Sequence, residues 1–363
     1  RSARLPVLYA GAGVVAAGAE RELQRLAVKL GAPIFTSIQG RGVISEQHPL
    51  CGGPATFEGA EATLSEADVA LALGTCFSQY TTLGWSLRLP EKLIQVDLDP
   101  SRIGRSYPVK VALVGDIKFV LESLLRRLEE EEGEEGEPSG EGAFRVRVHR
   151  HYYRERLRAF LAREQRAPFH GLWVVKTIRD VAPPETIFVT DSSATQAWLL
   201  EEAIPVYRPR SFLLSEAYQS MGYALPAAIG ARLAEPERPV LCVVGDGNMA
   251  MACAELASAR EAGVDLTVVV LNDGWYNALR ISQQHRYGGR YVGTKLQNPD
   301  FAALARSFGS RGVRVEDAEA LAPALERSFR EGGVHLVEVP LDPEVLPSRW
   351  ERAVRRWGQG TSS

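Results

Sequence analysis

The sequence predicts an α/β protein with two doubly wound parallel-sheet domains joined by an acidic linker. Short, continuously apolar segments alternate with segments of helical spacing, which is typical of parallel strands covered on both faces. This alternation occurs twice, once on each side of a stretch rich in Glu and Gly. The length of 363 residues accommodates two ordinary domains and a linker.

The first domain is expected over residues 1–128. It opens with a strand at Leu5–Ala10, a turn at Gly11-Ala12-Gly13 and a helix at Ala19–Leu30, where apolar residues recur three and four positions apart. The rest of this domain is expected to contain strands at Pro33–Thr36, Val69–Leu73 and Leu93–Val96 and a closing helix at Asp116–Leu128.

Residues 129–168 are expected to connect the domains. Glu129–Gly142 is acidic, rich in Gly and nearly free of apolar residues, so we expect a solvated linker there. Arg145–Arg166 is strongly basic, with a few apolar residues for one face, and predicts a surface helix.

The second domain is expected over residues 169–345, followed by a tail at 346–363. Its predicted strands are Thr186–Thr190, Ser211–Leu214, Val240–Val244, Leu266–Leu271 and His335–Val339. Its predicted helices include Gly222–Leu233, Ala250–Ala262, Pro299–Phe308 and Ala318–Arg330.

The bulk composition excludes several classes of function. A net charge of −3 gives no electrostatic case for nucleic acid or an anionic membrane. No apolar run approaches the roughly 18 residues of a membrane helix. The four cysteines form no CxxC pair, so a reducing cytoplasm is expected. Because the chain begins with Arg1 and not with Met, the absence of a signal segment is not informative.

Two polar turns follow predicted strands of the second domain. Gly245-Asp246-Gly247-Asn248 follows one strand, and Asn272-Asp273-Gly274 follows the next. The carboxyl ends of parallel strands meet at one edge of a sheet, where ligands bind. Mg²⁺ takes about six hard oxygen ligands, so two carboxylates and a backbone carbonyl leave room for phosphate oxygens and water. The alternative reading is two plain strand-to-helix turns.

The glycines of the first turn serve the same expectation. Gly245 and Gly247 let the backbone turn tightly and approach a ligand. A helix expected to start near Asn248 would point its free N–H groups toward a phosphate at this edge.

The spacing of these turns resembles the thiamin-diphosphate motif of a known enzyme superfamily. The segments Ser220–Gly230, Asn272–Arg280 and Asn298–Phe301 are similar to acetolactate synthases, as are Gly31-Ala32-Pro33, Gly40-Arg41-Gly42, His48-Pro49-Leu50 and Val96–Pro100 in the first half. The likeness covers nearly the whole chain. It implies a central domain followed by the domain that binds the cofactor's diphosphate.

The resemblance implies roles for particular residues. Asp246 and Asp273 would bind Mg²⁺ through their side chains, and Trp275 through its carbonyl oxygen. Met221 would wedge the cofactor into a bent shape, although a plain core methionine is the alternative. Residues implied to line the cofactor site are Ser193, Ala194, Thr195, Met221, Gly245, Asp246, Gly247, Asn248, Asp273, Trp275, Tyr276, Asn277 and Ala278.

The chain departs from the family pattern at three places near this site. Asp273 replaces an Asn, and two unit charges ~5 Å apart at an effective dielectric of ~20 repel by roughly 3 kcal/mol. Asn277 replaces a Gly. Ile281–Gln284 stands where acetolactate synthases carry a Trp, which puts acetolactate synthesis itself in doubt.

The resemblance also implies a pyrimidine-binding domain ahead of Arg1 that would supply a catalytic Glu. No Glu of this chain can be assigned that role, and Glu216 is implied to lie in the wrong domain. The catalytic residues are therefore unknown, and we expect a fragment, a processed product or half of a split enzyme. FAD is a further option for the central domain, but Gly11-Ala12-Gly13 with Gly18 is not a complete dinucleotide motif.

The resemblance implies a Mg²⁺- and thiamin-diphosphate-dependent carboligase of the acetolactate-synthase type, acting on a 2-oxo acid. A benzoylformate-type decarboxylase, a non-catalytic cofactor-binding subunit and a plain nucleotide-binding module remain as alternatives. The expected assembly is a homo-oligomer or a complex with a separate pyrimidine-domain chain. Pocket residues that set the substrate cannot be identified from the sequence.

Overall fold

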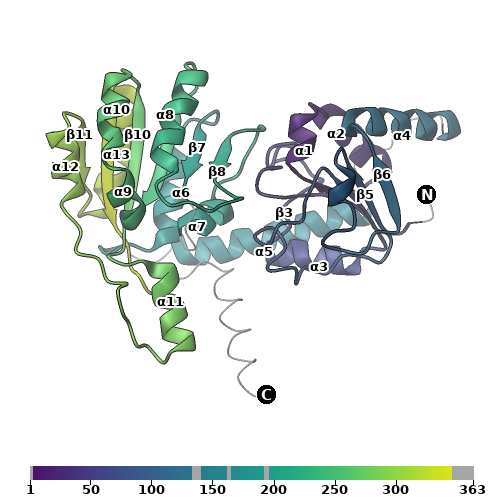
Figure 1. Ribbon diagram of the computed structural model, residues 1–363, viewed down its shortest axis with the longest axis horizontal. Helices are drawn as coiled ribbons and strands as arrows, with labels where there is room; N and C mark the ends of the chain where they lie inside the picture. The colour runs from purple at the N-terminus through teal and green to yellow at the C-terminus, as the bar shows by residue number, and fades with distance from the viewer. Residues whose placement is uncertain (1–2, 133–139, 162–164, 192–195, 346–363) are drawn as a thin grey trace. The chain divides into compact units, whose positions relative to one another are not determined.

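The computed structural model describes residues 3–132, 140–161, 165–191 and 196–345 of the chain. Contacts divide it into two compact units, one formed by residues 1–156 with 205–211 and the other by 157–204 with 212–363. Each unit is built around one six-stranded sheet, and both are traced in Figure 1. All named strand pairs are parallel, so the predicted fold class is confirmed.

The sheet of the first unit has the strand order β3-β2-β1-β4-β5-β6. Its strands are β1 (Pro6–Ala10), β2 (Ile34–Thr36), β3 (Cys51–Pro54), β4 (Val69–Leu73), β5 (Leu93–Asp97) and β6 (Val111–Val114). Its helices are α1 (Ala12–Ala16), α2 (Glu20–Leu30), α3 (Glu58–Glu66), α4 (Ile117–Glu132) and the first part of α5 (Glu141–Leu161).

Alternating residues of β1 show why this sheet is covered on both faces. Leu8 and Ala10 belong to one buried cluster, and Val7 and Tyr9 belong to another. Successive side chains of a strand point to opposite faces, so each face needs its own apolar cover. Helix α2 supplies part of one cover through the side chains predicted from its spacing.

Close backbone packing accounts for the glycine-rich turn after β1. A Cβ on Gly11 would lie 2.2 Å from the carbonyl oxygen of Gly74, and one on Gly13 would lie 2.6 Å from the Cα of Gly74. The two glycines therefore allow this turn to pack against the end of β4. The pattern has a structural cause and does not by itself require a bound dinucleotide.

The predicted linker is too long at both ends. Helix α4 continues to Glu132 and α5 begins at Glu141, while residues 133–139 lie outside the described chain. The basic helix starts before its predicted first residue because Glu141 forms an ion pair with Arg145 one turn later, at 2.7 Å. Arg150 fixes this helix to the first unit by donating to four backbone carbonyls, those of Glu46, Gln47, His48 and Cys51.

The second unit has the strand order β11-β12-β10-β9-β7-β8. Its strands are β7 (Ile187–Thr190), β8 (Phe212–Leu214), β9 (Val240–Gly245), β10 (Leu266–Asn272), β11 (Arg311–Arg314) and β12 (Val334–Pro340). Its helices are α6 (Gly171–Val181), α7 (Gln196–Ala203), α8 (Ala224–Ala234), α9 (Asp246–Ala252), α10 (Glu255–Glu261), α11 (Asn277–Arg286), α12 (Phe301–Ser307) and α13 (Ala318–Arg330).

The order in which strands are added to this second sheet reverses between β7 and β9: β8 is added on one side of β7, and β9 on the other. These two strands are neighbours although β8, at the sheet edge, lies between them in sequence. Helices α8, α10 and α12 contribute to the core on one face. Helix α13 covers the other face, where Ser328 accepts a hydrogen bond from Thr267 of β10 at 2.9 Å. The carboxyl ends of β7, β9 and β10 thus lie side by side at a topological switch point.

One predicted helix of this unit, Ala250–Ala262, is wrong. Ala250–Ala262 is not a single helix, because α9 starts at Asp246 and ends at Ala252 and α10 follows from Glu255. The predicted helix start near Asn248 is also two residues late, since Gly245 already occupies the N-cap.

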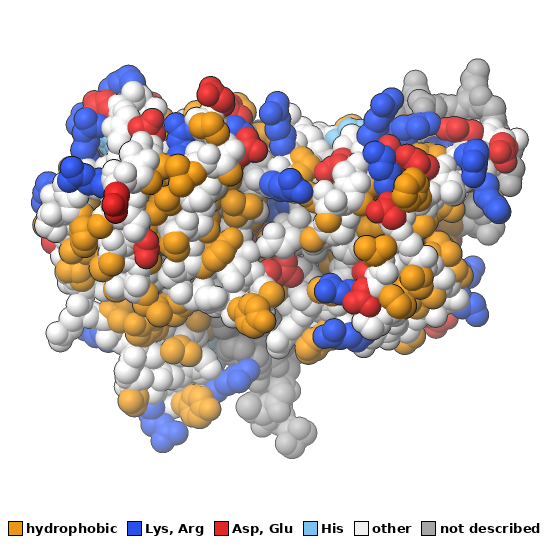
Figure 2. Space-filling model, turned by 45° about the horizontal axis from the view of Figure 1, so that its top comes forward, with side chains coloured by type: hydrophobic (Ala, Val, Ile, Leu, Met, Phe, Trp, Pro, Cys, Tyr) orange, Lys and Arg blue, Asp and Glu red, His pale blue; other side chains and the backbone are white. Residues whose placement is uncertain are grey.

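The surface agrees with the small net charge. Figure 2 shows cationic and anionic side chains intermingled on the face that it presents. In the part of the chain that the structure describes, no helix combines the length and apolar character needed to cross a membrane.

Candidate functional site

Two polar turns leave the second sheet at the same edge. β9 ends at Gly245 and β10 ends at Asn272, and Leu271 lies opposite Gly245 in the parallel ladder. Asp246 directly follows β9 and Asp273 directly follows β10. The structure therefore brings the two predicted metal ligands to neighbouring strand ends.

A hydrogen bond joins the two turns. The backbone N–H of Gly274 donates to Oδ2 of Asp246 at 2.8 Å, and the N–H of Gly247 donates to Oδ1 of the same carboxylate at 2.9 Å. Gly274 has a φ of 73°, in the left-handed region that favours glycine. The Asp246 carboxylate thus holds both turns at one place.

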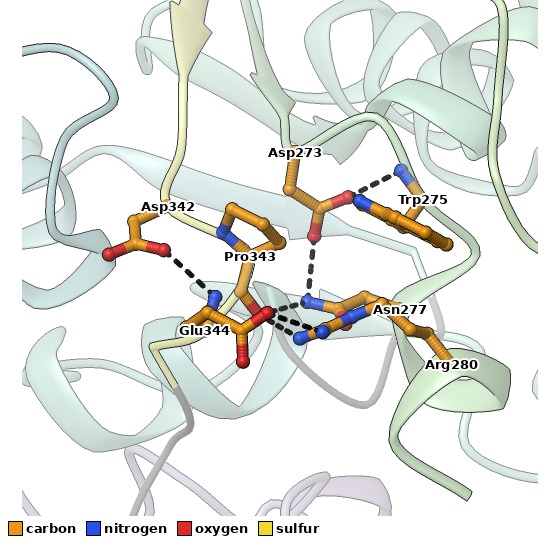
Figure 3. Close-up of polar contacts among 7 residues, drawn as sticks. All are labelled: Asp273, Trp275, Asn277, Arg280, Asp342, Pro343 and Glu344. Atoms are coloured by element: carbon orange, nitrogen blue, oxygen red, sulfur yellow. Dashed lines mark hydrogen bonds and ion pairs between the residues drawn. The ribbon is translucent and has the colours of Figure 1, made fainter. Parts of the chain in front are cut away.

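Asp273 is held from two sides. Its Oδ1 accepts a hydrogen bond from the backbone N–H of Trp275 at 2.9 Å, and its Oδ2 accepts one from Nδ2 of Asn277 at 3.0 Å (Figure 3). These contacts fix the plane of the carboxylate. Each oxygen keeps a lone pair for a further partner.

The electrostatics of the pair favour a bound cation. Burial raises the pKa of Asp246, and burial together with the negative charge of Asp246 raises the pKa of Asp273 to about 7. Only 1% of Asp246 and 9% of Asp273 is exposed, so solvent offsets little of this cost. A divalent cation would stabilise both ionised forms at once.

The donor set fits Mg²⁺, because carboxylate oxygens are the hard ligands that this ion prefers. Within the described residues, no three His, Cys, Asp or Glu side chains are grouped so that they could hold a metal ion. A cation at Asp246 and Asp273 would therefore complete its coordination with main-chain oxygens, water or a bound phosphate. Half-buried Trp275, in the loop after Asp273, is the predicted source of the main-chain oxygen.

Residues predicted to face the diphosphate also lie around these turns. A Cβ on Gly247 would lie 2.6 Å from Cε1 of Tyr276, so a glycine is needed where this ring packs on the first turn of α9. Asn248 is buried in the same turn. Tyr276 is the N-cap of α11, and half-buried Ala278 lies in the first turn of that helix.

The structure describes only part of the remaining predicted site. Met221 lies just before α8 and is 36% exposed, so it is not a core methionine. The nearby backbone is fixed by Asp191, whose Oδ1 accepts hydrogen bonds from the N–H groups of Tyr223 at 2.7 Å and Ala224 at 3.0 Å. The predicted residues Ser193, Ala194 and Thr195 lie outside the described residues.

Asp191 lies next to the candidate site, and motif spacing did not identify it. It directly follows β7, is almost fully buried, and has its pKa raised to about 6 by that burial. Its position as an acidic residue at the end of the apolar strand Ile187–Thr190 is the sequence signal that could have revealed it. Its carboxylate joins the end of β7 to the start of α8, beside Met221.

Three residues to which the sequence analysis assigned no individual role support Asp246. Nδ2 of Asn298 donates to Oδ2 of Asp246 at 2.6 Å and to Oδ1 of Asn272 at 3.0 Å. Nδ2 of Asn272 in turn donates to Oε1 of Glu338 at 2.8 Å. Glu338 is fully buried in β12 and also accepts from the backbone N–H of Phe301 at 3.1 Å. An acidic residue inside an otherwise largely apolar strand was the available signal for Glu338.

Comparison with known families gives two matches that together cover most of the chain. Residues 191–339 match the family described as "Thiamine pyrophosphate enzyme, C-terminal TPP binding domain". Residues 1–124 match "Thiamine pyrophosphate enzyme, central domain". The first match includes the switch point and both polar turns, and the second covers the glycine-rich turn and the first sheet.

Individual relatives align over nearly the whole chain. A "Probable 2-ketoarginine decarboxylase" of Pseudomonas aeruginosa is 38% identical over 346 residues, covering 93% of this chain and 58% of the relative. A "Probable acetolactate synthase large subunit" of Methanococcus aeolicus is 30% identical over 356 residues, covering 94% and 59%. A "Sulfoacetaldehyde acetyltransferase" of Castellaniella defragrans is 29% identical over 356 residues, covering 90% and 58%.

The chain thus spans a little under three fifths of the length of these relatives. Within that span the two family matches follow each other in the order of the two sheets. The sequence likeness and the paired turns at the switch point agree, and the chain belongs to the thiamin-diphosphate-dependent enzymes, among relatives that include acetolactate synthases.

Proposed function

We propose that this chain binds thiamin diphosphate through Mg²⁺ held by Asp246, Asp273 and the carbonyl oxygen of Trp275. The observation that carries the proposal is the hydrogen bond from Gly274 to Asp246, which fixes two buried carboxylates at neighbouring strand ends. The diphosphate would lie against the turns of Gly247 and its neighbours. Residues assigned to this contact are Ser193, Ala194, Thr195, Gly245, Gly247, Asn248, Tyr276, Asn277 and Ala278.

The proposed reaction is that of a 2-oxo acid carboligase of the acetolactate-synthase type. Thiamin diphosphate, when bound, supplies a carbon nucleophile for the 2-oxo acid carbonyl and accepts the electron pair released as CO₂ leaves. The residues of this chain orient that group. Asp246 and Asp273 hold the cation that offsets the diphosphate charge, and Met221 supports the cofactor from the turn before α8.

Cofactor binding by the 363-residue chain tests the metal assignment. We expect thiamin diphosphate to bind with Mg²⁺ and to lose at least tenfold in affinity when Mg²⁺ is chelated, because the diphosphate would then face two carboxylates directly. Asp246→Asn should cause a comparable loss. Isothermal titration calorimetry measures both effects.

A matched control separates this effect from a general loss of charge. Asp317 is an exposed aspartate before α13 whose side chain makes no capping hydrogen bond. Asp317→Asn should bind the cofactor like the wild-type chain. Equal cofactor affinity of Asp246→Asn and Asp317→Asn would contradict the proposed site.

One observation favours a decarboxylase as the second candidate. The relative with 38% identity is named a probable decarboxylase. Adding pyruvate, Mg²⁺ and thiamin diphosphate, with and without a separately produced pyrimidine-binding domain, distinguishes the candidates by product. Acetolactate indicates ligation and acetaldehyde indicates decarboxylation. Cofactor binding without turnover in either mixture indicates a non-catalytic cofactor-binding subunit.

The proposed assembly is a homo-oligomer or a complex with a separate pyrimidine-domain chain. Light scattering of the chain with and without that domain would distinguish these two arrangements. FAD forms no part of the proposal, because close packing of Gly11 and Gly13 against Gly74 already explains the glycine-rich turn.

A further inference from the structure

A buried guanidinium lies beside the proposed metal site. The side chain of Arg280, in the first turn of α11, is only 4% exposed. It donates through Nε to Oδ1 of Asn277 at 2.7 Å and through Nη1 to Oε1 of Glu344 at 2.5 Å, and its Nη2 donates to the carbonyl oxygen of Pro343. A buried charge is costly unless it is paired, so this set of partners holds Arg280 in one position.

Asn277 connects this guanidinium to the metal carboxylate. Its Nδ2 donates to Oδ2 of Asp273 at 3.0 Å and to the carbonyl oxygen of Pro343 at 3.1 Å, while its Oδ1 accepts from Arg280 (Figure 3). If the amide were flipped, its oxygen would face two acceptors, Oδ2 of Asp273 and the carbonyl oxygen of Pro343, and its NH₂ group would face the donor Nε of Arg280. The partners therefore fix the direction of the amide.

The segment after β12 supplies a rigid anchor for this chain of contacts. The backbone N–H of Leu341 donates to the carbonyl oxygen of Asn272 at 2.8 Å. The N–H of Asp342 donates to the carbonyl oxygen of Phe169 at 3.0 Å, and Oδ1 of Asp342 accepts from the N–H of Glu344 at 2.9 Å. The acceptors for Arg280 are thereby attached to the end of β10, the strand that precedes Asp273.

We propose that Asn277 and Arg280 are positioning residues for the metal carboxylate of Asp273, with Pro343 and Glu344 as their anchor. The inference rests on the proposed function, because it assumes that Asp273 binds Mg²⁺. Asp273 and Asn277 are two of the positions at which the sequence departs from the acetolactate-synthase pattern, and they contact each other. The Asn277 amide gives the added carboxylate a fixed donor.

Positioning and simple charge effects predict opposite results. At pH 9, where Asp273 is ionised, a purely electrostatic role would make Mg²⁺ bind more tightly once Arg280 is removed, because one repulsive interaction with the cation would disappear. If Arg280 orients Asp273 through Asn277, its removal frees the carboxylate to rotate and weakens Mg²⁺ binding. The direction of the change therefore identifies the role.

The test is a calorimetric Mg²⁺ titration of the 363-residue chain at saturating thiamin diphosphate and at pH 9, where protonation of Asp273 does not compete with the metal. We expect Arg280→Met to weaken Mg²⁺ binding about tenfold, the lower end of what loss of an outer-shell partner costs. Unchanged or tighter Mg²⁺ binding in this variant overturns the inference alone. A wild-type chain that binds no Mg²⁺ with the cofactor overturns the proposed function and the inference with it.

Arg232 offers a matched control. Like Arg280, it donates to backbone carbonyls, those of Asp265 and Arg238 among them, and it pairs with one carboxylate, Asp265, at 3.4 Å. Its contacts lie at the end of α8 and the start of β10, not at the proposed site. Arg232→Met should therefore leave Mg²⁺ affinity unchanged, and an equal loss in both arginine variants would overturn the inference.

Two further variants keep the test decisive if Arg280→Met fails to fold. Glu344→Gln changes a largely exposed carboxylate and should weaken Mg²⁺ binding less, in the same direction. Asn277→Ala should weaken it as much as Arg280→Met, and the double variant should lose no more than either single one, because both act through one chain of contacts. Wild-type Mg²⁺ affinity in Glu344→Gln and Asn277→Ala would overturn the inference.

Discussion

A carboxylate at position 273 gives this site two buried negative charges where an amide would give one. Burial, together with the negative charge of Asp246, raises the pKa of Asp273, so the ionised form of Asp273 is costly without a cation. A divalent cation offsets that cost and gains a second charged ligand. The same substitution that disfavours the empty site therefore increases its dependence on the metal.

The Asp273→Asn variant tests this consequence. We expect cofactor binding to depend less on Mg²⁺ in the variant, because the diphosphate no longer meets a second carboxylate when the metal is absent. The ratio of thiamin diphosphate affinities with and without Mg²⁺ measures the effect. An unchanged or larger ratio in the variant would show that the charge at 273 has no such role.

Motif spacing could predict Asp246, Gly247 and Asp273 because each stands at a fixed offset from a strand end. Asn298 and Glu338 could not be predicted in this way. They reach the site from loops and strands that return to it much later in the chain. No local pattern encodes which distant side chain meets a given carboxylate.

At the scale of elements, Glu338 links three parts of the second unit. It joins β12 to β10 through Asn272, to α12 through the N–H of Phe301, and to β11 through an ion pair with Arg314. The fully buried carboxylate thus satisfies donors from three elements at once. The ends of these elements in turn position Asn298 and Asp246.

Replacing Glu338 should disrupt this junction. We expect Glu338→Leu to lower the free energy of unfolding by about 3 kcal/mol, because it leaves buried donors without an acceptor. Urea unfolding measures this change. Glu316→Leu, at an exposed position that precedes α13, is the control and should stay within about 0.5 kcal/mol of wild type. Equal stability of the two variants would contradict the structural role of Glu338.

The described strands that the sequence did not predict, β3, β6 and β11, all lie at sheet edges, and of these only β6 is continuously apolar. β3 reads Cys-Gly-Gly-Pro and β11 reads Arg-Gly-Val-Arg, so neither has a continuous apolar run. An edge strand needs apolar residues less than a central one does, because it has only one neighbouring strand and less cover. Central strands such as β9 and β10 are largely apolar, and their predicted first residues, Val240 and Leu266, are the first residues of the strands in the structure.

At the scale of the whole molecule, the acidic groups of the site give its metal-free form an unusual pH dependence. In the folded protein the pKa of Asp191 is raised to about 6 and that of Asp273 to about 7, against an ordinary value of 3.8. At pH values between the ordinary pKa of 3.8 and these raised pKa values, the folded state binds more protons than the unfolded state. The contribution of these groups to stability is therefore present at low pH and is lost as the pH rises toward 7.

Bound Mg²⁺ should reverse this trend, because it stabilises the ionised carboxylates. We expect the increase in melting temperature on adding Mg²⁺ and thiamin diphosphate to be largest above pH 7 and to shrink as the pH falls toward 5. Differential scanning fluorimetry over this range measures it. Asp273→Asn should show a flatter profile, and the comparison removes the cofactor's own titration. Identical profiles would contradict the assignment of Asp273.

The pairing of Leu271 with Gly245 has a consequence for how such a chain can change its length. The distance between the two acidic side chains is set across the sheet and not along the 26 residues from Gly247 to Asn272. Residues added near Gly263, between α10 and β10, would lengthen the connection from β9 to β10 and leave the cation's ligands in place. One residue added inside β10 would turn Asp273 away from Asp246, because successive strand residues face opposite sides.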